Sequence, residues 1–291
     1  MIDSSLEGLD DLLGHRSSLL LVYQSELDRL VTLASRGYDT GGVGSEVALG
    51  EGMIGMAAAR RRSMRMGNLK RMLNYARTVQ RSAGNDSGAD TEIRLPGLSD
   101  AGSQMAAPLV AGGVLLGVLA VESRADLAYD EEDEHVFAVA AHLVAAALER
   151  EQLSTSEPEP TSAILHPPSR VVGPQPVQSS APEPIVIRHY AIDGSTFFDD
   201  SYVIKGVAGR LLWKLVSDYS STGRTSFTNR EAKLDPVLDL PSYRDNFESR
   251  LILLKRRLEE RNSPLRITSA GRGLFELHVS TPLVLEHINS G

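Results

Sequence analysis

The sequence predicts an α+β protein in which two domains are joined by a proline-rich linker. Residues 1–152 alternate strand-sized apolar runs with helical ones, which is typical of a sheet covered by helices. Residues 153–184 are rich in proline, serine and glutamate and show neither a helical nor a strand period. Residues 185–282 hold three helical patterns and a terminal apolar hairpin, and residues 283–291 are interpreted as a tail. A stretch as long as residues 153–184 without a period favours a domain boundary over a loop.

The composition restricts the chemistry of both domains. The chain has 291 residues, no cysteine and a formal net charge of −8. The absence of cysteine excludes disulfides, thiolate metal sites and a cysteine nucleophile. The charge is uneven, since residues 1–184 carry −10 and residues 185–291 carry +2. An acidic half followed by a mildly basic half indicates two different roles.

The N-terminal segment has no basic start followed by an apolar stretch, so we expect no signal peptide. The longest apolar runs are strand-sized and fall short of the roughly 20 residues of a membrane-spanning helix. The sequence therefore predicts a cytoplasmic protein that does not enter a membrane.

In the first domain we expect a helix over residues 6–13, strands over 18–24, 29–38 and 45–50, and a helix over 53–59. Gly112-Gly113 lies between two apolar runs and predicts a hairpin turn. The last helix begins with an acidic turn, which suits the positive end of the helix dipole. Its apolar residues predict one buried stripe, made of Val136, Val139, Ala140, Leu143, Val144 and Ala147.

Three segments in this order resemble the GAF domain family. They read LGEGMIGMAAARRRSMRMGNL, then SQMAAPLVAGGVLLGVLAVESR, then LAYDEEDEHVFAVAAHLVAAAL. They match the family's glycine turn, its strand with a following glycine turn, and its aromatic and aspartate start of the last helix. The resemblance covers nearly all of residues 6–150.

The resemblance implies an antiparallel sheet with helices, a sensor or dimerisation role, and a homodimer. It also implies a non-covalent small-molecule ligand held against the sheet, because no cysteine is present to bind a bilin or to perform the family's reductase chemistry. The residues expected near such a ligand are Met53, Met66, Asn68, Tyr75 and Met105. The methionines have an alternative interpretation as adaptable core filling. The histidines show no metal-ligand spacing, so no metal is expected.

In the second domain we expect a strand from residue 185, a turn at Asp193-Gly194 and a further short strand, taken from residues 195–200 or 201–206. A helix over 207–221 is expected to end at Gly223. Thr228 followed by Glu231 predicts a capping box at the start of the second helix.

The third helix carries a stripe formed by Phe247, Leu251, Leu254 and Leu258. At about 100° per residue, Arg250, Arg257 and Arg261 gather on one flank of that stripe. A hairpin follows, with Arg272 between Gly271 and Gly273 at its tip. Three helices followed by a hairpin predict a winged helix-turn-helix domain.

The run RLILLKRRLEERNSPLRITSAGRGLFELHV resembles the response-regulator-type (PhoB/OmpR-like) winged-helix DNA-binding family. The resemblance implies that the third helix enters the major groove of double-stranded DNA and that the hairpin lies beside it. The DNA-contacting residues that it implies are Arg244, Asn246, Ser249, Arg250, Leu253, Arg257 and Arg272. The chain departs from the family at Ile252 and Leu253, which are apolar, and in having a GAF-like domain where a receiver domain is usual. Exposed adjacent aliphatics more often mark a contact surface, and the alternative is a contact with thymine methyl groups.

The sequence therefore predicts a DNA-binding transcriptional regulator in which a GAF-like domain senses a small ligand or a signalling partner and controls a winged helix. The alternative is a signalling adaptor whose winged helix binds protein, which the small positive charge and Ile252-Leu253 favour. No catalytic constellation is present in the sequence, so we expect no enzyme.

Overall fold

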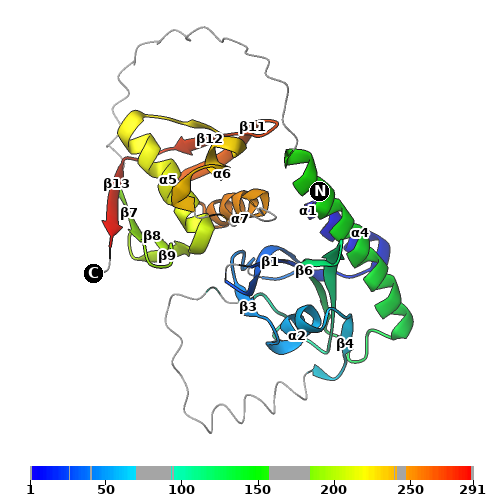
Figure 1. Ribbon diagram of the computed structural model, residues 1–291. Coiled ribbons are helices and arrows are strands. Elements are labelled where there is room, and N and C mark those ends of the chain that lie inside the picture. Colours follow the sequence, from blue (N-terminus) through cyan, green and yellow to red (C-terminus); the bar gives the residue numbers. More distant parts are fainter. Residues whose placement is uncertain are drawn as a thin grey trace.

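The computed structural model describes residues 2–25, 27–39, 41–69, 93, 95–156, 184–238, 240 and 247–289. Each half of the chain forms its own sheet and helices, and helix α7 of the second half lies between the two halves (Figure 1). Among the predicted site residues, Tyr75, Arg244 and Asn246 lie outside the described residues.

The first domain contains a six-stranded sheet in which all neighbouring strands are antiparallel, in the order β3-β2-β1-β6-β5-β4. The strands are β1 (Ser17–Gln24), β2 (Arg29–Arg36), β3 (Glu46–Ala48), β4 (Met64–Met66), β5 (Ser103–Ala111) and β6 (Val114–Ser123). The helices are α1 (Ile2–Leu13), α2 (Gly52–Arg60) and α4 (Glu131–Ser156). Gly112 and Gly113, both at positive φ, form the predicted β5–β6 turn.

Side chains alternate between the two faces of this sheet, as the period of a strand requires. Leu19, Leu21 and Val118 pack on the side of α2, with Met53 and Ile54 of that helix. Leu20, Val22, Met105 and Leu119 belong instead to the core that includes α1 and α4. Because both faces of the sheet are covered, its central strands are apolar at nearly every position.

Helix α4 buries a different stripe from the one predicted. The buried residues are Phe137, Ala141, Val144, Ala145 and Leu148. Val136, Val139 and Leu143 are exposed, so of the predicted stripe only Val144 is fully buried. The many alanines of this helix permit either face to pack, and Phe137, the largest side chain, selects the face that meets the sheet.

Within its described residues, the second domain contains two sheets and three α-helices. The sheets have the orders β13-β7-β8-β9 and β10-β12-β11. The helices are α5 (Gly206–Thr222), α6 (Asn229–Lys233) and α7 (Phe247–Glu260), with a short 3-10 helix η1 (Pro236–Leu238) after α6. The strands are β7 (Ile185–Tyr190), β8 (Thr196–Phe198), β9 (Ser201–Ile204), β10 (Ser226–Thr228), β11 (Leu265–Gly271), β12 (Leu274–Val279) and β13 (Leu283–Ile288).

Several local predictions for this domain are confirmed, the capping box forms only in part, and the predicted tail is wrong. Gly223 ends α5 at a φ of 72°, and the Thr228 hydroxyl accepts a hydrogen bond from the Glu231 amide as a cap. The Glu231 carboxylate binds Arg224 instead of completing the capping box. Both candidate strands after the turn form, as β8 and β9. Residues 283–288 are a strand parallel to β7 and not a tail, since Leu283 and Leu285 pack on the core.

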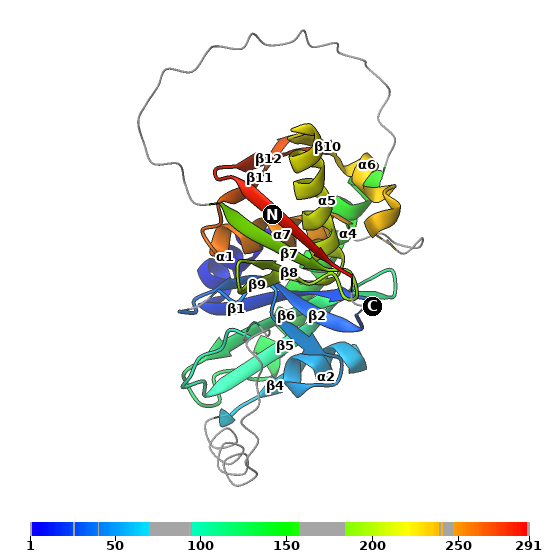
Figure 2. The same ribbon diagram turned by 90° about the vertical axis from the view of Figure 1, so that its left-hand side faces the viewer.

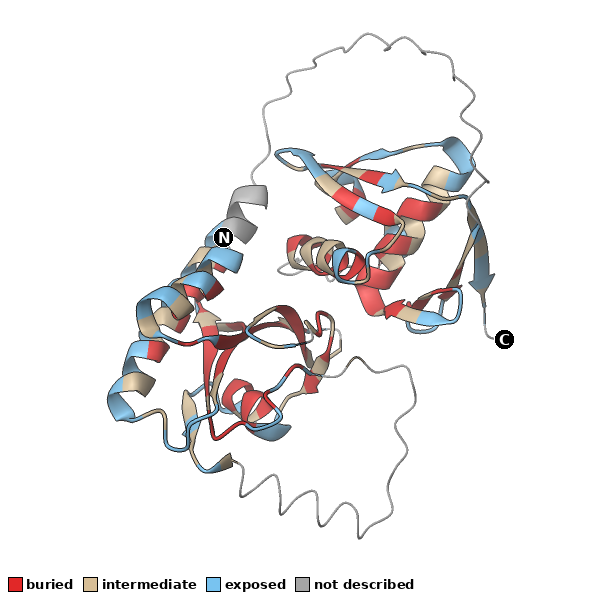
Figure 3. Ribbon diagram, turned by 180° about the vertical axis from the view of Figure 1, so that it is seen from behind, coloured by how far each residue is buried: buried red, intermediate tan, exposed pale blue. Residues whose placement is uncertain are grey.

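The two domains meet along α7. Seen from the side, α7 lies at the level where the second domain approaches α1, β1 and β2 of the first (Figure 2). Coloured by burial, α7 is buried or half-buried along most of its length, whereas the outward side of α4 is exposed (Figure 3). The geometry of α7 is therefore set by both domains.

Candidate functional sites at α7 and between the domains

The core stripe of α7 is largely as predicted. Phe247, Leu254 and Leu258 are buried and Leu251 is half-buried against the same core. An ion pair of 2.9 Å between Lys233 and Glu248 joins α6 to the start of α7. This stripe fixes which sides of the helix remain for other contacts.

The arginine flank of α7 binds within its own domain. The Arg257 guanidinium donates to the Val203 carbonyl of β9 and to Glu260, at 2.9 Å each. Arg261 donates to the Tyr202 carbonyl at 2.9 Å and also to the Ser201 hydroxyl. Arg250 is only 1% exposed. Arg257 and Arg261 thus anchor α7 to β9. The helical projection could not predict this contact, because it considers α7 alone.

The expectation that Ile252 and Leu253 form an exposed pair is wrong. Leu253 is buried and Ile252 is half-buried against the core. The projection treated α7 as a helix packed on one side only. It is enclosed on two sides, because its own domain covers one and the first domain covers another.

Leu253, Arg256, Arg257 and Glu260 follow the three- and four-residue spacing of one helix side, which we call the docking face of α7. Arg256 donates to Asp3 of α1 at 2.8 Å. The Glu260 carboxylate accepts a hydrogen bond from the Val43 amide at 3.4 Å. This face therefore contacts the first domain at both α1 and the loop before β3.

Glycines in that loop permit the close approach. A Cβ atom at Gly41 would lie 2.1 Å from Oε1 of Glu260. A Cβ atom at Gly44 would lie 3.9 Å from Cδ of Arg257. The loop thus presents backbone, with little side chain, to α7.

The hairpin tip stands away from these contacts. Arg272 is exposed between Gly271 at φ 142° and Gly273 at φ 69°, so the turn uses the backbone freedom of glycine. The Asn229 amide donates to the Gly273 carbonyl at 2.8 Å, which fixes the hairpin against the start of α6.

The remaining predicted DNA contact on α7, Ser249, is half-buried.

The predicted ligand residues of the first domain are only partly brought together, since Met53 and Met66 pack in one apolar cluster and Met105 lies in another. Met53 packs on the α2 side of the sheet and Met105 packs on the opposite side, in the core with α4. Met66 is half-buried on β4, and Asn68 has a left-handed φ of 57° after that strand. Their spacing in the sequence did not reveal that β5 turns Met105 away from α2.

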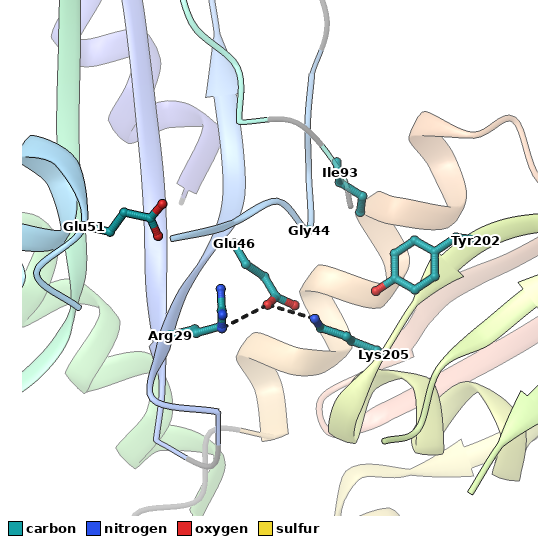
Figure 4. A pocket seen from close by; sticks show the side chains of 7 residues that line it. All are labelled: Arg29, Gly44, Glu46, Glu51, Ile93, Tyr202 and Lys205. Carbon is teal, nitrogen blue, oxygen red and sulfur yellow. Dashed lines mark ion pairs between the residues drawn. The ribbon is translucent and has the colours of Figure 1, made fainter. Parts of the chain in front are cut away.

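A polar cavity of about 210 Å³ lies between the domains (Figure 4). Glu46 lies at its centre. Its Oε2 atom is 3.6 Å from Nε of Arg29 in the same domain and 3.1 Å from Nζ of Lys205 in the second domain. Tyr202 of the second domain also lines the cavity, and burial raises the pKa of its hydroxyl. Sequence reasoning missed this cavity because its residues converge only when the domains dock.

A second cavity of about 370 Å³ lies at the end of the first sheet, between α1 and α4. Glu122 and Tyr129 line it, with His15 and Asp133. Burial raises the pKa of Glu122, whose carboxyl group accepts from the Leu98 amide at 2.8 Å. Burial lowers the pKa of His15, and Asp133 partly offsets this. The cavity offers both donors and acceptors to a small polar molecule.

Comparison with known proteins identifies the first domain. The family model described as "GAF domain" matches residues 1–149, which is half of the chain. The chain belongs to the GAF domain family. Its GAF domain is a small-ligand sensing module of the kind found in signalling proteins, and the GAF resemblance seen in the sequence is confirmed.

Solved structures similar to this chain align with about half of it. The GAF domain of an Acinetobacter phosphoenolpyruvate-protein phosphotransferase is 16% identical, with 51% of this chain and 80% of that chain covered and a TM-score of 0.40. The free methionine-R-sulfoxide reductase of Neisseria meningitidis, solved with its substrate, is 19% identical over 52% and 77%, with a TM-score of 0.39. Residues 122 to 287 of a methyl-accepting chemotaxis protein are 23% identical over 53% and 89%, with a TM-score of 0.38. No curated protein matches the sequence.

Two searches of the described residues bear on other classes of site. None of the helices there has the length and apolar character that crossing a membrane requires. Across the same residues, His, Asp and Glu side chains form no group of three that could hold a metal ion.

Proposed function

We propose that this protein is a cytoplasmic, non-enzymatic transcriptional regulator, in which the GAF domain senses a small ligand or partner and the second domain binds double-stranded DNA as a winged helix. The observation that supports DNA binding most directly is the order of the second domain. A capped α6 precedes α7, and a hairpin with exposed Arg272 at its tip follows and is hydrogen-bonded to α6. In winged helices the hairpin and the helix before it contact the same duplex.

Arg272 is the residue with the clearest access to phosphate. It is exposed and lies between two glycines of positive φ at the tip of the hairpin. A guanidinium group there suits a phosphate or the minor groove. Of the other residues that the resemblance assigns to DNA, Ser249 is half-buried on α7, and Arg250, Leu253 and Arg257 are buried. Arg257 is held by the Val203 carbonyl of its own domain, so a contact with the major groove requires these side chains to rearrange as well as the docking face to open. Arg244 and Asn246 precede α7 in the sequence.

The test is selection of binding sequences from random duplex DNA with the full chain, followed by affinity measurement. We expect Arg272→Ala to weaken binding on the order of tenfold and to reduce its salt dependence. Arg266→Ala is the matched control, since Arg266 is exposed on the same hairpin but lies away from its tip. Absence of binding at low salt, or equal affinity of both variants and the native chain, contradicts DNA binding.

A signalling adaptor is the second candidate. It is favoured by the docking face of α7, which makes a protein contact in this structure and includes the buried Leu253. An adaptor would bind no duplex at low salt and would retain a protein partner when Arg272 is replaced by alanine.

We also propose a homodimer formed through α4. Val136, Val139 and Leu143 are spaced on one outward side of this helix and are 44%, 61% and 69% exposed. An apolar stripe of this kind on a long helix suits a second copy of the same helix. A dimer would present two DNA-binding domains to two half-sites.

A further inference from the structure

Two sets of residues on α7 overlap. The positions that the winged-helix resemblance assigns to the major groove are Ser249, Arg250, Leu253 and Arg257. The docking face contacts the GAF domain through Arg256 and Glu260, and Cδ of Arg257 would lie 3.9 Å from a Cβ atom at Gly44. The buried Leu253 lies on the same side of the helix. Leu253 and Arg257 belong to both sets.

The overlap has a steric consequence. A major groove is about 12 Å wide and takes one helix, whose own diameter is about 10 Å. Asp3 of α1 and the loop at Gly41 and Val43 lie in hydrogen-bond or van der Waals range of that helix. A duplex cannot occupy the same side of α7 while these groups are in place.

We infer that the GAF domain masks the DNA-reading side of α7, so that the GAF domain and DNA compete for it. This rests on the proposed function, because it assigns the regulation of the same DNA site. The structure is then the closed form of the protein, and DNA binding requires the domains to separate.

The contacts suit a reversible mask. Asp3 is 78% exposed and the Glu260 hydrogen bond is long at 3.4 Å, so solvent competes for both. The cavity around Glu46 lies at the same interface and is lined by both domains. A molecule that binds there in the closed form favours that form, whereas disruption of the Glu46–Lys205 pair favours opening.

A disulfide between positions 41 and 260 tests the inference. A Cβ atom at Gly41 would lie 3.7 Å from Cγ of Glu260, and Gly41 has no positive φ. The Cγ atom of Glu260 stands where the sulfur of a cysteine at position 260 would lie, so the two new thiols would face each other at short range. The native chain has no cysteine, so the double variant Gly41→Cys/Glu260→Cys contains only the two intended thiols.

We expect the double variant to crosslink on oxidation, as seen by faster migration on a non-reducing gel. The oxidised protein should bind the selected duplex at least tenfold more weakly than the same protein after reduction. Each single cysteine variant, oxidised in parallel, controls for the substitution itself. Failure to crosslink, or a crosslinked protein with unchanged affinity, overturns the inference and leaves the proposed function standing.

The same experiment also shows whether the proposed DNA binding itself fails. If neither the native chain nor the reduced double variant binds DNA, the proposed function fails and the inference fails with it. The crosslink in that case still reports that the domains touch.

A second variant tests the inference if the double cysteine variant of the protein does not fold. Asp3→Lys places a cation against Arg256 and should raise the affinity for DNA several-fold by opening the interface. Glu7→Lys makes the same charge change on α1, but Glu7 faces Arg36 of its own domain, so it should leave the affinity unchanged. Equal affinity of the two variants overturns the mask.

Discussion

Arg256 and Asp3 lie at opposite ends of the sequence, and the Arg256 Nη2 and Asp3 Oδ2 atoms are 2.8 Å apart. This ion pair joins α7 of the second domain to α1 of the GAF domain. The second domain has a separate core stripe on α7, formed by Phe247, Leu254 and Leu258. The stability of each fold should therefore depend little on the contact between them.

The first prediction is that Arg256→Ala changes the free energy of unfolding by no more than about 1 kcal/mol, because its partner is 78% exposed to solvent. Lys214→Ala should cost more, about 1–3 kcal/mol. Its amino group is mostly buried and lies 3.0 Å from Asp218 and 2.7 Å from Asp235, so two carboxylates lose their partner. Chemical denaturation of both variants measures the difference. A larger loss from Arg256→Ala would show that the interdomain contact supports the fold.

The second prediction compares two glycines. Gly117 lies in the central strand β6, where an added Cβ atom would be 2.0 Å from the carbonyl oxygen of Leu21. Gly117→Ala should therefore force β1 and β6 apart and cost about 1–3 kcal/mol. Gly8 lies inside α1 with nothing within 4 Å of an added Cβ atom, so Gly8→Ala should stabilise by about 0.5–1 kcal/mol. Thermal unfolding of the two variants should move in opposite directions, and a shared direction would contradict the geometry.

Much of the fold could be predicted from the sequence because its signals are local. The glycine pair at 112 and 113, the cap at Thr228 and the stop at Gly223 act on their own turns, and each appears where expected. The apolar stripe of α7 was predictable for the same reason, since it needs only one helix and one core.

The errors concern burial that depends on distant partners. The helix period predicted one buried stripe on α4 that includes Val139, and the position of the sheet buries Phe137 instead. Leu253 resembles a surface residue on an isolated helix, yet it is 2% exposed and lies on the helix side whose Arg256 and Glu260 contact the first domain. The cavity around Glu46 was not predictable at all, since Lys205 and Arg29 belong to different domains.

The third prediction concerns pH. His189 is buried beside Trp213, at 5.1 Å between ring centroids, and beside His287 at 5.7 Å. Burial, with the nearby His287 and Arg210, lowers the pKa of His189 to about 4, against an opposing effect of Asp193. The unfolded chain therefore binds this proton more readily than the folded chain between about pH 6.5 and 4. The contribution of the neutral, buried His189 to the free energy of unfolding is complete above pH 6.5. As the pH falls towards 4, the free energy of unfolding decreases by about 3 kcal/mol, because the unfolded chain takes up the proton first.

The comparison with His189→Gln isolates this effect from other titrating groups. The free energy of unfolding of the native chain should fall more steeply between pH 6.5 and 4 than that of the variant. Emission from Trp213, the only tryptophan, reports the transition. Parallel curves for the two proteins would show that His189 titrates normally.

The last prediction concerns the outward side of α4. Val139 and Leu143 are 61% and 69% exposed, although they lie on the longest helix that the structure describes, and exposure of apolar side chains to water is unfavourable. If a second copy covers them, Val139→Glu/Leu143→Glu places two carboxylates at the apolar contact and should convert the dimer to a monomer, as measured by light scattering during size-exclusion chromatography. Ile192→Glu is the matched control, since Ile192 is 75% exposed in the second domain, away from α4, and should leave the mass unchanged. A native chain that is monomeric at all concentrations tested would contradict the dimer, and a dimer that persists in the double variant would place its interface elsewhere.

Loss of the dimer should also affect DNA binding, because α4 leads directly into the chain segment that connects the two domains. The paired DNA-binding domains would separate, and binding to two half-sites should weaken more than binding to one.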